Sequence, residues 1–99
     1  MSLDTVLKHD PLITRVSVGT SETSHTFRTY LRGFMVKCQS AVDIRAALES
    51  GETADSSDYI PINAGETWWE DDVYSGGQQW VLYLKSTSGT VGVTVMEWK

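Results

Sequence analysis

The sequence is poor in residues that would cross-link the chain or anchor it in a membrane. Among 99 residues there is one cysteine, Cys38, so no intramolecular disulfide and no cysteine-based metal site can form. A single cysteine at the apolar end of a strand is most often a small buried hydrophobe. No apolar run approaches the roughly 18–20 residues that a membrane helix needs, and the N-terminus lacks the layout of a signal peptide. We therefore expect a chain that folds in a cytoplasm without cross-links.

Basic residues and histidines are also scarce. Eight Lys and Arg stand against thirteen Asp and Glu, a formal net charge of −5, which argues against nucleic acid and anionic membrane as partners. His9 and His25 both lie in the N-terminal quarter, and the sequence has no nucleophile elbow, phosphate-binding glycine loop or His-x-x-x-His pair. We therefore expect no enzymatic activity, no catalytic residues and no cofactor.

Acidic residues gather in two places, residues 66–72 and the pair Asp55 and Asp58. Calcium takes six to eight oxygen ligands, usually from a loop of alternating acids. The three consecutive acids 70–72 would point to alternate faces of a strand, so they cannot all bind one ion. We expect solvated acids and no metal site.

Short segments of alternating apolar and polar residues make up most of the chain. Strands are predicted over residues 12–18, 25–39, 41–48, 59–63, 67–74 and the two arms of a C-terminal hairpin, although residues 41–48 would also tolerate a helix. The apolar phase of 25–39 changes at Gly33, which indicates either one bent strand or two strands of a sandwich. Pro61 marks an edge strand. The pattern predicts an all-β, antiparallel β-sandwich that is jelly-roll-like, with about seven or eight short strands. Residues 1–11 are predicted to form an N-terminal arm, flexible or bound to a partner, and residues 12–99 one domain.

The C-terminal hairpin, residues 80–98, is the strongest local signal. Two β-rich arms flank a Ser/Thr/Gly cluster, and an even loop at Ser88-Gly89 would pair Leu84 with Val93 and Leu82 with Val95. This register gathers one apolar face, made of Leu82, Leu84, Val91, Val93 and Val95.

Aromatic residues supply the candidate contact sites. Adjacent Trp68 and Trp69 must face opposite sides of a strand, so one belongs to the core and the other faces outward. An outward tryptophan indicates a protein interface or a platform for a sugar ring, and we weigh the interface more heavily. The candidate interface or ligand contacts are Trp68, Trp69, Tyr74, Tyr83 and Trp98.

Residues 37–99 resemble short virion accessory proteins of tailed bacteriophages. The resemblance is carried by Val42-Asp-Ile-Arg45 before a polar loop, by Tyr59-Ile-Pro-Ile-Asn-Ala-Gly-Glu66, and by Leu82-Tyr-Leu-Lys-Ser-Thr-Ser-Gly-Thr-Val91 ending in Met96-Glu-Trp98. It implies a non-enzymatic capsid-decoration, head-fibre or tail accessory protein, synthesised in the bacterial host cytoplasm and located in the virion. Its partners would be its own copies, with a trimer favoured, and other virion proteins.

Two alternatives to this function are kept. The first is a carbohydrate-binding β-sandwich module with a Trp68/Trp69 platform and the 55–58 loop. The second is a β-sandwich enzyme subunit whose active site is completed by another chain.

Overall fold

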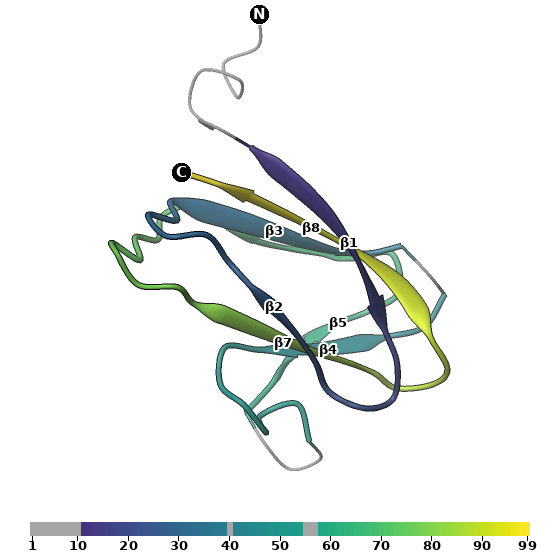
Figure 1. Cartoon of the computed structure of the whole chain (residues 1–99). Coiled ribbons are helices and arrows are strands. Elements are labelled where there is room, and N and C mark those ends of the chain that lie inside the picture. Colours follow the sequence, from purple (N-terminus) through teal and green to yellow (C-terminus); the bar gives the residue numbers. More distant parts are fainter. Residues whose placement is uncertain (1–10, 40, 55–57) are drawn as a thin grey trace, which may run out of the picture.

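Eight short strands account for the regular structure of residues 11–39, 41–54 and 58–99, which the computed structural model describes (Figure 1). They are β1 (Leu12–Val18), β2 (Thr23–Thr26), β3 (Gly33–Cys38), β4 (Ile44–Ala47), β5 (Ile60–Ile62), β6 (Thr67–Glu70), β7 (Val81–Ser86) and β8 (Val91–Trp98). No helix occurs within these ranges, so no helix of the described residues can cross a membrane. The predicted all-β class is confirmed.

The strands form two four-stranded antiparallel sheets. Sheet A has the order β1-β8-β3-β6 and sheet B the order β2-β7-β4-β5. Each strand pairs with the strand at the mirrored place in the chain: β1 with β8, β2 with β7, β3 with β6, and β4 with β5. Pairings of β3 with β8 and of β4 with β7 complete the two layers, which Figure 1 shows one above the other. This is the arrangement of a jelly roll, an antiparallel ribbon rolled into two sheets.

The predicted pairing of the C-terminal hairpin is wrong. β7 belongs to sheet B and β8 to sheet A, so Leu84 lies opposite Thr23 and Ala46, whereas Val93 lies opposite Val16 and Cys38. The four residues 87–90 can span about 13 Å, enough to cross the roughly 10 Å between packed sheets. Alternation predicts which side chains face the core, but it does not say whether neighbouring strands share a sheet.

The buried face of these two strands is nevertheless the predicted one. Leu82 and Leu84 point inward from sheet B, and Val91, Val93 and Val95 point inward from sheet A; all five are buried. Around them lies a core to which Phe27, Leu31, Phe34, Val36, Ile44 and Ile62 also belong. The core therefore fills the space between the sheets, and within it the rings of Phe27 and Phe34 contact each other.

Several predicted segments are confirmed with shorter bounds. Residues 25–39 are not one bent strand but contribute to two strands in different sheets, which was the other predicted alternative. The later of these strands, β3, begins at Gly33. Residues 41–48 contain a strand, not a helix, and β5 is an edge strand as Pro61 predicted. Cys38 is fully buried, as expected for a small hydrophobe. Most of the predicted arm, residues 1–10, lies outside the described residues.

Two segments end earlier than their patterns predicted. β4 ends at Ala47, so Leu48 is 42% exposed although its phase predicted an inward position. β6 ends at Glu70, so the acids that follow and Tyr74 belong to a connection and not to a strand. An apolar phase alone does not show where the ladder of hydrogen bonds stops.

Candidate functional site

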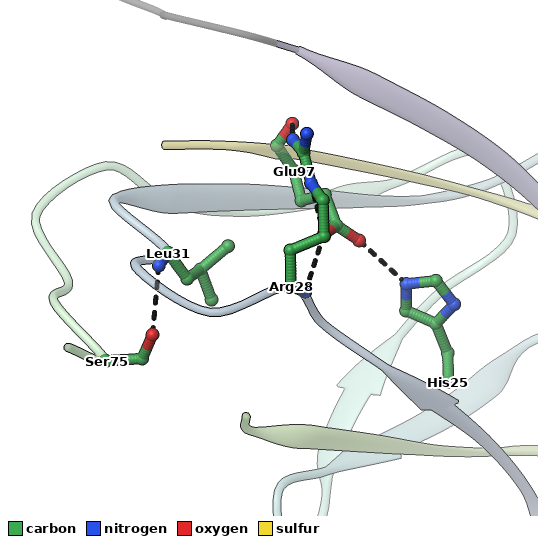
Figure 2. Close-up of polar contacts among 5 residues, drawn as sticks. All are labelled: His25, Arg28, Leu31, Ser75 and Glu97. Atoms are coloured by element: carbon green, nitrogen blue, oxygen red, sulfur yellow. Dashed lines mark hydrogen bonds and ion pairs between the residues drawn. The ribbon is translucent and has the colours of Figure 1, made fainter. Parts of the chain in front are cut away.

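A buried carboxylate joins the two sheets at one end of the sandwich (Figure 2). Glu97 continues the inward phase of β8 after three valines, and its side chain is 1% exposed. His25 on β2 places its Nε2 2.9 Å from Oε2 of Glu97. Arg28 donates to Oε1 from its backbone N at 2.8 Å and from its Nε at 3.0 Å. Because side chains alternate along β8, the carboxylate of Glu97 points into the sandwich. Its hydrogen-bond donors are His25 of β2 in the opposite sheet and Arg28 in the loop after β2.

The ionised form of Glu97 is the favoured one in this site. Burial opposes ionisation, but the hydrogen bonds from His25 and Arg28 outweigh it and hold the pKa of Glu97 below its ordinary value of 4.5. Arg28 also donates from Nη2 to the backbone oxygen of Glu97 at 3.2 Å. A carboxylate so fully engaged by hydrogen-bond donors serves as an electrostatic clamp between the sheets.

The outer face of sheet A carries an apolar row that crosses all four strands. Ile13 of β1 lies opposite Met96 of β8, Met96 opposite Met35 of β3, and Met35 opposite Trp69 of β6. Ile13 is 64% exposed and Trp69 is 46% exposed, and the two methionines between them are half-buried. The row crosses four neighbouring strands that lie about 4.8 Å apart, so it is about 14 Å long. We call it the sheet A row.

Charges of opposite sign flank the sheet A row. Two residues further along the strands, Arg15 and Lys37 lie on either side of Thr94, and both are exposed. On the other side of the row, the exposed acids 70–72 follow Trp69 at the end of β6. The face therefore has an apolar centre with Arg15 and Lys37 on one side, and with the three acids 70–72 and the single cation Arg32 on the other.

A groove of about 480 Å³ lies on the outer face of sheet B. It is formed where the end of β4 meets the start of β7, and its lining consists of Leu48, Glu49, Ser50, Gln79, Trp80, Val81 and Tyr83. A smaller hollow of about 370 Å³ shares Leu48 and Glu49 with it and is completed by Ala47, Glu52 and Asp58. The two outer faces of the sandwich thus differ: one presents a ridge of apolar side chains, the other a groove.

The structure does not bring the five predicted contact residues together. Trp69 and Trp98 lie on the outer side of sheet A, with ring centroids 6.3 Å apart. Trp68 turns inward and packs edge-on against Phe34, as predicted for one of the two adjacent tryptophans. Tyr74 is 62% exposed in the connection after β6, where its ring lies under the guanidinium of Arg32.

The remaining predicted contact, Tyr83, lies on the opposite sheet, in the groove. Trp98 is only 3% exposed, which leaves it little surface to offer a partner. The predicted site is therefore dispersed over both faces of the sandwich. Trp69 and Tyr83 are the members that its two outer faces present.

Sequence reasoning missed most of the residues that make these surfaces. Ile13, Met35 and Met96 come from three strands far apart in the sequence, and they form a row only through the β1-β8-β3-β6 order. A partial signal for the buried clamp was present, because Glu97 continues the inward phase of β8. That phase would have placed a carboxylate in the core and prompted a search for its cationic partners.

The described residues contain no group of three or more His, Cys, Asp or Glu placed to hold a metal ion. No protein-family model matches the chain, and no curated protein or solved structure is significantly similar to it.

Proposed function

We propose that this protein is a non-enzymatic structural component of a bacteriophage particle that forms a homo-oligomer and contacts other virion proteins. The observation that carries the proposal is the sheet A row. Met and aromatic residues are enriched at protein interfaces, and a continuous apolar patch on an outer sheet face marks a contact site. The row contains two methionines and a tryptophan, and an isoleucine extends it at the edge strand.

The charges beside the row favour a second copy of the chain as one occupant. A surface with cations on one side and acids on the other can place its basic side against the acidic side of an identical surface. Lys37 and the acids 70–72 supply the two signs. Complementary charges at the rim of an interface set the orientation and the rate of association, while the apolar centre supplies most of the affinity.

The fold agrees with this class of function without deciding it. Jelly rolls occur in viral capsid proteins and in lectins, and one fold supports many functions. The alternative of a carbohydrate-binding module stays a prediction: the ring of Trp68 packs against Phe34, and Trp69 is the exposed tryptophan that a sugar could contact on sheet A.

The oligomer is tested by size-exclusion chromatography with light scattering over a hundredfold range of concentration. We expect a closed oligomer, a trimer first, that the substitution Ile13→Lys dissociates into monomers. The matched control is Ile60→Lys, because Ile60 is 38% exposed on the edge of sheet B and should leave the oligomer intact. A wild-type chain that is monomeric at every concentration would overturn the proposal.

The location in the particle needs a separate test. Mass spectrometry of purified particles of the phage whose genome encodes this chain should detect it in a fixed ratio to the major structural proteins. Its absence from particles that contain the other structural proteins would exclude a virion role. The solution oligomer would then have to serve another purpose.

A further inference from the structure

The groove on sheet B is lined by aromatic rings and by two polar side chains that make no hydrogen bond to other described residues. Val81 and Tyr83 project outward from β7, and Trp80 precedes them at the start of the strand. Glu49 and Gln79 reach the groove from the ends of two connections. Among the described residues, no hydrogen bond uses the side chain of Glu49 or Gln79.

This combination suits a pyranose sugar. The C–H face of a pyranose ring packs on an aromatic ring, while neighbouring hydroxyls need donors and acceptors held side by side. Glu49 offers two acceptor oxygens and Gln79 offers one acceptor and two donors. The groove volume of about 480 Å³ falls within the range of natural small-ligand sites. We propose that this groove binds a pyranose saccharide that is uncharged or carries an amino group.

The charge of the surroundings selects among sugars. Glu49 lines both the groove and the adjoining hollow, and Glu52 and Asp58 line the hollow as well. Glu49 is the charged residue in the groove itself, while the cations of the same outer face, Arg45 and Lys85, lie two residues further along β4 and β7. A carboxylate so placed repels sulfated, phosphorylated and uronic acid sugars, and it attracts a protonated amine. A neutral hexose or a hexosamine is therefore the ligand class that matches both the rings and the charge.

A peptide fits this place less well. Extended peptides bind sheets by adding a strand to a free edge. The groove lies over β7, and both edges of β7 are already paired, with β2 on one side and β4 on the other. A ligand over β7 therefore meets the outward side chains of the strand and not a free strand edge, which is how a sugar ring would be held.

The sugar site does not depend on the proposed assembly. The sheet A row and the groove occupy opposite outer faces of the sandwich, so copies joined through sheet A would leave the groove open. A closed oligomer would then present several grooves at once, and binding several units of one glycan chain would raise the apparent affinity well above that of one groove.

The test is titration calorimetry of the full chain with three soluble probes: cellohexaose, a chitosan hexamer and hexagalacturonic acid. We expect saturable binding of cellohexaose or the chitosan hexamer and none of the anionic probe. Tyr83→Ala should weaken binding about tenfold or more, and Gln79→Ala about three- to tenfold. Glu49→Gln should weaken binding of the chitosan hexamer more than that of cellohexaose.

Trp80 also packs against the core, so an alanine at this position would endanger the fold. The variant made at this position is therefore Trp80→Phe. Trp69→Ala is the matched control, an exposed tryptophan removed from the opposite sheet, and it should leave the affinity of one groove unchanged. No binding of either favoured probe at millimolar concentration would overturn the proposal. So would binding that Tyr83→Ala leaves intact, or a preference for the anionic probe. Because the oligomer is measured separately, each of the two proposals can fail while the other stands.

Discussion

The indole ring of Trp98 occupies the space in which a Cβ atom of residue 33 would lie. Gly33 and Trp98 are register partners on β3 and β8, and a Cβ on residue 33 would overlap Cζ2 of the ring. Trp98 is 3% exposed and has Trp69 beside it, so the ring has little room to move away. The glycine at the start of β3 thus lets a tryptophan lie flat on sheet A.

Gly33→Ala should destabilise the protein because the new methyl group meets the indole ring. Overpacking of this kind costs about 1–3 kcal/mol, and we expect the upper part of that range because the ring of Trp98 is buried and has Trp69 beside it. Urea unfolding followed by tryptophan fluorescence gives the free energy of unfolding. Gly92→Ala is the control, since Gly92 is exposed on β8 with open space where a Cβ would lie, and it should be neutral or stabilising by up to about 1 kcal/mol. Equal losses in the two variants would contradict this account.

Removing the buried carboxylate should weaken the joint between the sheets. Glu97→Ala leaves Arg28 and His25 without their shared partner, and breaking a buried ion pair costs about 3–5 kcal/mol. Arg28 and His25 keep some contact with solvent, with side chains 26% and 13% exposed, so we expect a loss near the lower limit. The same urea titration measures it. Asp72→Ala removes an exposed acid and should change stability by less than about 0.5 kcal/mol; a loss of similar size there would count against the clamp.

The clamp also predicts how stability depends on pH. The pKa of Glu97 is lower in the folded chain than its ordinary value of 4.5, because the hydrogen bonds from His25 and Arg28 outweigh the effect of burial. Its contribution to stability is therefore complete above pH 4.5 and is lost as the pH falls through the folded value. Urea midpoints measured between pH 3 and pH 7 should fall on the acid side in the wild type. Glu97→Gln should flatten that acid limb, and an unchanged limb would show that other carboxylates cause it.

Glu22 holds the turn that follows β4. Its carboxylate accepts hydrogen bonds from the hydroxyl of Thr53 and from the backbone N of Gly51, and these bonds lower the pKa of Glu22. In Glu22→Ala the Gly51 amide should exchange with deuterium about tenfold faster, as measured by NMR. The Asn63 amide, which donates to Glu66 at 2.9 Å, provides an internal reference that should not change. An unchanged Gly51 rate would mean that the turn is held by other contacts.

The fold class was predictable because alternation survives in nearly every segment. β1 begins and ends where the pattern of residues 12–18 predicts, and Pro61 correctly marks an edge strand. What alternation cannot convey is which strands become neighbours. The link at residues 87–90 looks like a hairpin loop in sequence, but the chain crosses there from one sheet to the other.

The candidate surfaces were less predictable, for the same reason. The opposite orientations of Trp68 and Trp69 followed from the period of a strand, and the structure makes Trp69 the exposed one. The partners of Trp69 in the sheet A row required knowledge that β8 lies between β1 and β3. The groove required the end of β4 to be beside the start of β7. Both surfaces are products of long-range pairing, which local patterns do not record.

The mirrored pairing of strands has a consequence for the order in which the protein can form during synthesis. β8, the last of the eight described strands in chain order, lies inside sheet A between β1 and β3. Until it emerges, β1 has no neighbour in its sheet and the Glu97 clamp has no carboxylate. The pair β4 and β5 is joined by the shortest connection among the mirrored pairs and can form first, whereas β3 with β6 and β2 with β7 must close longer loops. Folding should therefore be slow and complete only after β8 leaves the ribosome, and the nascent chain would expose its valines and phenylalanines until then.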